Sequence, residues 1–468
     1  MGNIVFYGLA PHPPILLPEV GGRESEKVNS TFSSMEEFAG RVAASGAEIL
    51  VIISPHGSVF SDGVAINGSK ILSGDLRMFR ADLEFEYNND HEMIQEIIEQ
   101  ARQVGITAVE IDDGLAGEYG ISVKLDHGVL VPIYFFNRAG IDLPIVSISM
   151  SMLPFEELYM FGFAVKKAVE TRGCKAAVVA SGDMSHRLTR EAPAGYSPEG
   201  ELFDRKIVEL LKNKDFRGVI NIDRNMAESA GECGLRTLIM MLGAMDGEDV
   251  DAEVLSYEGP FGVGYLVAAF TPTGRPAEGI LAQLFEDRRE KTVNRRKGES
   301  IPVTLARNAL EAYVKKGRRI VPDTDEDTGL LLEEQAGVFV SLKKQGQLRG
   351  CIGTVMPTTD NIGQEIVQNA ISAGTRDPRF NPVREDELDE LVYSVDILRP
   401  PERIQGPDQL DVKRYGVIVR SGRKSGLLLP NLEGINTVEE QVEIARQKAG
   451  ISPGEPVELE RFEVIRYY

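Results

Sequence analysis

The sequence has 468 residues, and we expect two domains because single hydrophobic cores rarely grow past about 300 residues. Its formal net charge of −21 argues against a non-specific nucleic-acid binder and against docking on anionic membranes. The three cysteines exclude a disulfide framework. The sequence shows neither a signal-peptide pattern nor an apolar run of membrane-spanning length, so we expect a cytoplasmic protein.

The segment 1–271 alternates between apolar runs of strand length and helical patterns. The expected strands are residues 4–9, 49–53, 129–136, 144–149, 176–180 and 265–270. The expected helices are residues 27–45, 90–104, 154–172, 198–212 and 231–245. The strand runs are continuously apolar, which is typical of a sheet covered on both faces. We therefore predict an α/β domain with a largely parallel central sheet and flanking helices.

The segment 272–300 differs in composition and predicts a connector that is helical in part. It opens with Thr-Pro-Thr-Gly-Arg-Pro and ends in a run rich in Arg and Lys. We expect this basic run to be a solvated face, because the chain around it is acidic.

The segment 301–468 predicts a smaller α+β domain, because its helices and strands alternate less regularly. Helices are expected at 301–316, 362–373 and 438–450, and strands at 337–343, 349–354, 391–398, 416–420 and 426–429. The oligomeric state stays open, a homo-oligomer included.

All five histidines lie in the first domain, and three of them follow predicted strands. These are His12, His56 and His186. Ligand sites in open α/β sheets lie outside the carboxyl ends of the strands, so we expect these imidazoles to converge at one edge. Pro11 and Pro55 stiffen the two loops that lead to His12 and His56. The pattern predicts a metal site.

The third ligand is expected to be Glu232, at the start of a helix. Two histidines and one carboxylate leave open positions on Fe(II), which suits oxygen chemistry. Glu232 would equally serve as an ordinary first-turn acid of that helix. Cys233 is the alternative ligand, and its thiolate would favour zinc or copper over iron.

Two further residues are candidates for supporting roles. His127 precedes an apolar run and would donate a hydrogen bond near the metal. Asp183 lies three residues before His186 and would orient its imidazole or cap a turn. His91 starts a helix and is expected at the surface.

Five short segments of the first domain resemble the class III extradiol ring-cleavage dioxygenases of the LigB type. The segments are Ala10-Pro-His12-Pro-Pro-Ile-Leu, Ser54-Pro-His56, Asp126-His127-Gly-Val-Leu-Val-Pro, Ser181-Gly-Asp-Met-Ser-His186 and Gly231-Glu232-Cys-Gly-Leu-Arg. The resemblance implies Fe(II) bound by His12, His56 and Glu232, with His186 as acid/base and His127 near the substrate. It implies extradiol opening of a catechol-like small molecule by O2.

The Ser-Gly-Asp-Met-Ser-His stretch also resembles the Memo family, which shares this fold and has a cysteine near the position of Glu232 and Cys233. Glu232 favours the dioxygenase ligand set, whereas Asp183 favours the Memo family. The alternative function is therefore a metal-binding or redox accessory protein that does not cleave rings.

The second domain resembles the AMMECR family in Gln347-Leu-Arg-Gly-Cys351-Ile-Gly-Thr. Arg349 and Cys351 are its candidate site residues, and a tight hairpin with a buried cysteine is the structural alternative. Families of these two types recur with radical-SAM enzymes, so the resemblance implies such an enzyme as a partner.

Overall fold

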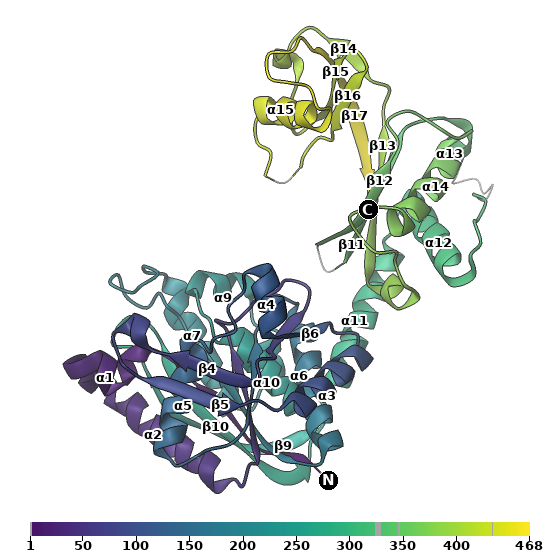
Figure 1. The fold of residues 1–468 in the computed structure, drawn as a ribbon. Coiled ribbons are helices and arrows are strands. Elements are labelled where there is room, and N and C mark those ends of the chain that lie inside the picture. The colour runs from purple at the N-terminus through teal and green to yellow at the C-terminus, as the bar shows by residue number, and fades with distance from the viewer. Residues whose placement is uncertain (1, 323–328, 345–346, 433) are drawn as a thin grey trace. The chain divides into compact units, whose positions relative to one another are not determined.

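The computed structural model describes residues 2–322, 329–344, 347–432 and 434–468 (Figure 1). The chain divides into two units, Met1–Phe285 and Glu286–Tyr468. The division falls within helix α11 (Ile280–Lys297), inside the segment that changes in composition.

The N-terminal unit is built on a central sheet with the strand order β6-β3-β7-β2-β8-β1-β10-β9. The strands are β1 (Asn3–Ala10), β2 (Ile49–Ser54), β3 (Val64–Asn67), β6 (Ala108–Ile111), β7 (Ile145–Ser149), β8 (Lys175–Ser181), β9 (Glu248–Glu258) and β10 (Tyr265–Pro276). Strands β7, β2, β8 and β1 pair in parallel, while β10 pairs antiparallel with β1 and β3 antiparallel with β7. The predicted, largely parallel sheet is confirmed.

Helices cover both faces of this sheet, which explains the continuous apolar strands. Leu50 and Ile52 of β2 pack with α2 (Asn29–Ala44) and α5 (His127–Arg138). Val51 and Ile53 of the same strand face the other core, together with α3 (His91–Gln103), α6 (Phe155–Arg172), α7 (Pro198–Lys212) and α10 (Leu235–Ala244). Successive residues of a strand thus enter different cores.

Shorter elements complete the N-terminal unit. They are α1 (Pro18–Gly21), α4 (Asp113–Tyr119), α8 (Phe216–Ile220), α9 (Arg224–Ala230) and a hairpin of β4 (Ile71–Asp75) and β5 (Glu84–Asn88). These surface elements lack long periodic patterns, and the sequence did not indicate them.

The expected strand at residues 129–136 is wrong, because this segment forms most of α5. The side chain of Asp126 caps the helix by accepting the N–H of Gly128, and residues 128–136 are all buried. A helix buried on every side has no polar face, so its apolar residues form a continuous run like that of a buried strand. The other strands and helices expected in this unit are present. The helix expected at 231–245, however, begins only at Leu235, so Glu232 precedes the helix and does not lie in its first turn.

The C-terminal unit combines one antiparallel sheet with helices, as the sequence predicts. The sheet has the order β12-β11-β13-β17-β15-β16, with β14 beside β17. Its strands are β11 (Val338–Lys344), β12 (Gln347–Gly353), β13 (Leu391–Leu398), β14 (Glu402–Ile404), β15 (Tyr415–Ser421), β16 (Lys424–Leu428) and β17 (Glu458–Tyr467). Its further helices are α12 (Ile301–Lys316), α13 (Gly329–Glu333), α14 (Ile362–Thr375) and α15 (Val438–Lys448). Helices α12 and α14 cover one face of β11 and β13.

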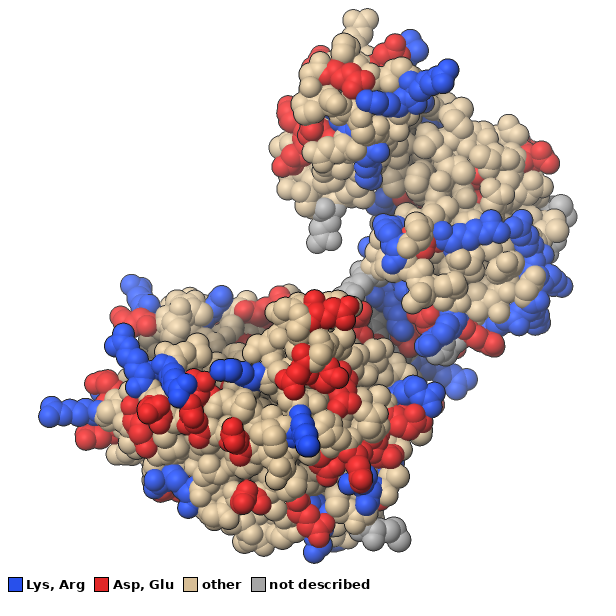
Figure 2. All heavy atoms as spheres, in the orientation of Figure 1, with Lys and Arg blue, Asp and Glu red and all other residues tan. Residues whose placement is uncertain are grey.

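The surface matches the acidic composition. On the face shown in Figure 2, acidic side chains are interspersed with basic ones over the N-terminal unit. Within the described part of the chain, no helix is both long and apolar enough to cross a membrane.

Candidate metal centre

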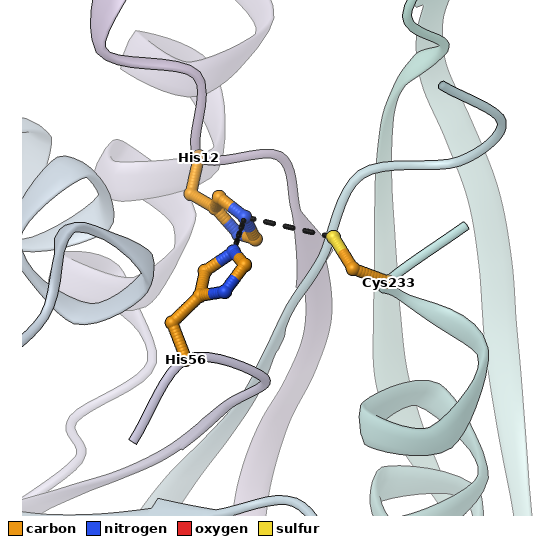
Figure 3. Close-up of side chains that lie close together, drawn as sticks. All are labelled: His12, His56 and Cys233. Carbon is orange, nitrogen blue, oxygen red and sulfur yellow. Dashed lines mark hydrogen bonds between the residues drawn. The ribbon is translucent and has the colours of Figure 1, made fainter. Parts of the chain in front are cut away.

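Three potential metal ligands from distant parts of the chain meet at the carboxyl edge of the central sheet (Figure 3). His12 follows β1, His56 follows β2, and Cys233 precedes α10. His12 Nε2 lies 2.9 Å from His56 Nε2 and 3.7 Å from Cys233 Sγ. The sequence-based expectation that strand-end histidines converge therefore describes His12 and His56 correctly.

The two distances from His12 Nε2 are close to those around a single ion, and all three ligand atoms lie within 4.8 Å of one another. Zinc-type bonds of about 2.0 Å to nitrogen and 2.3 Å to sulfur place tetrahedral donors roughly 3.3 Å (N···N) and 3.5 Å (N···S) apart. The two imidazole nitrogens would separate by about 0.4 Å to reach that geometry, starting from 2.9 Å. The site is open on one side, because His12 is buried whereas His56 is exposed.

Glu232, expected as the third ligand, is not a member of this group, which contains the alternative ligand Cys233 instead. The Oε2 atom of Glu232 accepts the backbone N–H of Leu235 at 2.6 Å, at the start of α10. Burial raises the pKa of this carboxyl to about 7. The carboxylate thus satisfies a free N–H at the helix start. The candidate ligands that lie together in the structure are two imidazoles and the thiol of Cys233, which is the alternative that the sequence left open.

Cys233 reaches the histidines because two loops approach closely. A Cβ atom on Gly182 would lie only 2.1 Å from the Cα of Gly234, so glycine is required at this contact. The backbone N–H of Asp183 donates to Cys233 Sγ at 3.3 Å, and the N–H of Cys233 donates to the Asp183 carbonyl at 3.3 Å. An N–H directed at sulfur favours its thiolate form.

The two remaining predicted histidines flank the same group. The His127 ring stacks on His56 with centroids 4.4 Å apart, and it meets the ring of Phe79 at 5.3 Å. His186 Nε2 lies 3.8 Å from Cys233 Sγ. Four imidazoles and one thiol therefore share this edge, while His91 pairs elsewhere with Glu110 at 2.9 Å.

The imidazoles are held in their neutral forms. Burial lowers the pKa of His12 well below its usual value, and the neighbouring imidazoles lower it further. Burial likewise lowers the pKa of His56 and His186, and that of His127 to about 4. Burial also raises the pKa of the Cys233 thiol, so a cation that binds there has to displace a proton. Neutral imidazoles offer the nitrogen lone pairs that metal ions need.

Asp183 supports the loop of His12. Its Oδ1 accepts the backbone N–H of His12 at 2.9 Å, and burial raises its pKa to about 7. The carboxylate therefore anchors the backbone of His12. This contact is neither of the two roles that the sequence left open, which were to orient the imidazole of His186 or to cap a turn.

A polar cavity adjoins the loop of His56. Its lining includes Ser58, Asn67, Asp126, Ser147 and Ser149. These hydroxyl, amide and carboxylate groups are suitable hydrogen-bond partners for a bound water beside the loop of His56.

Arg349 and Cys351 lie on β12 in the C-terminal unit and have partners within that unit. Both Nε and Nη2 of Arg349 donate to the Glu387 carboxylate at 3.0 Å. Cys351 Sγ accepts from Ser341 Oγ at 3.3 Å, and its N–H donates to Asp377 at 2.9 Å. A functional site at Cys351 stays a prediction.

Sequence reasoning missed Ser181 and Phe79, which touch the site's histidines. Ser181 Oγ lies 2.9 Å from His12 Nδ1. It is the last residue of β8, so the strand-end argument applied to every polar residue would have indicated it. Phe79 lies in a short 3-10 helix (Arg77–Phe79) with no distinctive pattern.

Two family models match the chain. The catalytic LigB subunit of aromatic ring-opening dioxygenase matches residues 7–268, and AMMECR1 matches residues 303–467. These matches agree with the two resemblances found in the motifs.

Relatives are found over the whole chain and over parts of it. A protein of Clostridium acetobutylicum is 43% identical over 463 residues, which cover 99% of this chain and 98% of the relative. A Thermotoga maritima protein is 51% identical over 172 residues, covering 36% of this chain and 98% of its own length. Among solved structures, an uncharacterized Pyrococcus horikoshii protein is 36% identical, covers 35% of this chain and 88% of its own, and has a TM-score of 0.33.

Proposed function

Because the chain belongs to the LigB family of aromatic ring-opening dioxygenases and also carries an AMMECR1 domain, we propose that its N-terminal domain is a metal-dependent redox protein. His12, His56 and Cys233 would bind the ion. The observation that carries the proposal is the approach of these three ligand atoms to within 4.8 Å of one another. The ion would supply one-electron redox or Lewis-acid chemistry.

The ligand set favours copper, and zinc next, over Fe(II). Two imidazoles and one thiolate are the trigonal ligands of copper sites, and thiolates also suit zinc. Non-haem iron oxygenases instead use two histidines and a carboxylate. Here Glu232 directs its carboxylate to the N–H of Leu235. We therefore propose that the domain acts as a metal-binding or redox accessory protein without extradiol ring opening.

Iron-dependent extradiol ring opening of a catechol-like substrate by O2 is the second candidate function. The family match and the two additional imidazoles support it. His186 is neutral at pH 7 because burial lowers its pKa, so it could accept a proton from a bound diol. His127 and Phe79 would cover one side of such a ligand.

Metal titration of ligand variants tests the ion site. Chelator-treated protein would be titrated anaerobically with Cu(I), Zn(II) and Fe(II) against competing chelators. We expect one tight copper equivalent, and we expect its loss in His12→Ala, His56→Ala and Cys233→Ser. Cys351→Ser is the matched control and should bind as wild type, since Cys351 belongs to the other unit.

The same titration separates the two candidates. Loss of metal in Glu232→Gln with full binding in Cys233→Ser would refute the thiolate ligand and restore the iron triad. Yellow ring-fission products from iron-loaded protein, catechols and oxygen would refute the accessory role. In that case His186→Ala should keep the metal and lose turnover.

The proposal includes a cytoplasmic location, which the scarcity of cysteine predicts. It also includes a radical-SAM enzyme as partner, as the resemblance of the two domains to their families implies. Anaerobic co-purification of the full chain with a radical-SAM enzyme of the same organism tests it. Equal recovery with and without residues 301–468 would contradict a role of that domain in the contact.

A further inference from the structure

The ring nitrogen of His12 that faces away from the proposed ion is held by Ser181. His12 Nδ1 lies 2.9 Å from Ser181 Oγ, and this hydroxyl donates its hydrogen to the Gly128 carbonyl. Ser181 is fully buried, so its hydroxyl has no access to bulk water. A serine hydroxyl has only one hydrogen to donate. Toward His12 it can therefore only accept, and Nδ1 of the neutral ring must carry the proton.

We propose that Ser181 is a positioning residue that fixes His12 in its Nδ1–H tautomer and so presents the Nε2 lone pair to the ion. The inference rests on the proposed function. Nε2 is the atom that lies 2.9 Å from His56 and 3.7 Å from Cys233. With the proton on Nε2 instead, His12 would hydrogen-bond to His56 Nε2 and offer no lone pair to a metal.

The carbonyl that orients Ser181 is itself fixed by the loop of His56. The N–H of Gly128 donates to Asp126 Oδ1 at 2.7 Å, and Ser54 Oγ donates to the same oxygen at 2.6 Å. Ser54 Oγ also accepts the backbone N–H of His56 at 3.3 Å. One chain of hydrogen bonds thus connects the His12 ring to the loop that positions the other imidazole.

The proposal predicts a loss of metal affinity without a loss of fold. Outer hydrogen-bond partners of metal-binding histidines typically contribute about 10–100-fold to metal affinity. We expect Ser181→Ala to raise the copper dissociation constant by this factor. Ser181→Thr retains a hydroxyl and should restore most of the affinity.

Ser185→Ala is the matched control. Ser185 is another fully buried serine close by in the chain, and like Ser181 its hydroxyl donates to a backbone carbonyl, that of Ala230. The group that donates to Ser185 is the backbone N–H of Arg187 and not an imidazole. The Ser185→Ala variant, like Ser181→Ala, loses one buried hydrogen bond, which stabilises the fold by only about 1 kcal/mol. Because this hydrogen bond does not involve an imidazole, the copper affinity of Ser185→Ala should stay within about threefold of wild type.

The tautomer can be measured independently of metal binding. In metal-free protein labelled with 15N-histidine, long-range 1H–15N spectra distinguish protonated from unprotonated ring nitrogens. We expect protonated Nδ1 and unprotonated Nε2 for His12 in wild type, and a shift of the proton toward Nε2 in Ser181→Ala. The five histidines make assignment by single replacements feasible.

Each outcome is decisive. A protonated Nε2 in wild type would overturn the inference, and this measurement needs no variant to fold. Unchanged tautomer and unchanged copper affinity in Ser181→Ala would also overturn it. If wild type shows the expected tautomer but binds neither copper, zinc nor iron, the tautomer assignment stands and the proposed function fails.

Discussion

Replacing Asp204 by Asn should remove a pH-dependent loss of stability from the N-terminal unit. Asp204 lies on α7 and is fully buried. Its Oδ1 accepts the N–H of Ser185 at 2.7 Å, and its Oδ2 accepts the Tyr257 hydroxyl at 2.7 Å. Burial raises the pKa of this carboxyl to about 6 in spite of both hydrogen bonds. Because Ser185 precedes His186, the same carboxyl anchors the segment that carries this imidazole.

The size of the effect follows from the shift in pKa. A rise from 3.8 to about 6 corresponds to about 3 kcal/mol at roughly 1.4 kcal/mol per pKa unit. Since the folded-state pKa is raised, the protonated form favours folding. The contribution is fully present below pH 3.8 and is lost as the pH rises through 6. Asparagine does not ionise, and it can accept from Ser185 and donate to Tyr257.

Urea unfolding of wild type and Asp204→Asn between pH 3.5 and 8 measures this effect. The free energy of unfolding of the variant, relative to that of wild type, should increase by about 3 kcal/mol over this range. Titrating groups that do not interact with Asp204 cancel in the difference. The charge of Asp204 also raises the pKa of Asp183 and of Glu232, so its removal changes their contributions in the same direction. A difference that stays flat, or that falls with rising pH, would refute the assignment of the raised pKa to Asp204.

Asp249→Asn is a control of opposite sign. Hydrogen bonds from Thr273 and Arg275 lower the pKa of Asp249. Its carboxylate therefore stabilises the fold above the ordinary Asp pKa, and this stabilisation is lost as the pH falls. The Asp249→Asn variant should lose stability relative to wild type as the pH rises.

Two further predictions concern packing and ion pairing. Gly243→Ala should lower the free energy of unfolding by about 1–3 kcal/mol or more, because its Cβ would lie 2.0 Å from the Tyr159 carbonyl where α10 packs on α6. An unchanged urea midpoint would contradict this close contact. Asp377→Asn should destabilise the C-terminal unit at pH 7, because hydrogen bonds from Arg379 and Cys351 hold the pKa of Asp377 below its usual range. We expect faster amide hydrogen exchange in β12 of Asp377→Asn than of wild type at pH 7, and we expect this difference to decrease below pH 4. Equal exchange rates in the two proteins at pH 7 would contradict the prediction.

Helix α5 and the start of α10 show where sequence reasoning reached its limit. Residues 129–136 are continuously apolar, and such a run fits a buried helix as well as a buried strand until the cap at Asp126 is seen. Glu232 and Cys233 are neighbours in the chain, and both are plausible ligands. Which of them faces His12 depends on the backbone path before α10, and there Glu232 turns back to the N–H of Leu235.

By itself the sequence determined the order of most helices and strands and the edge at which the site lies. It could do so because hydrophobic periodicity reflects burial, and because parallel strands direct their carboxyl ends to one edge. Only the tertiary structure decided that the thiol of Cys233, and not the carboxylate of Glu232, lies in one group with the two imidazoles, and that Ser181 and Asp183 contact His12. These choices depend on close backbone approaches between segments far apart in the chain, such as Gly182 against Gly234, which no local pattern encodes.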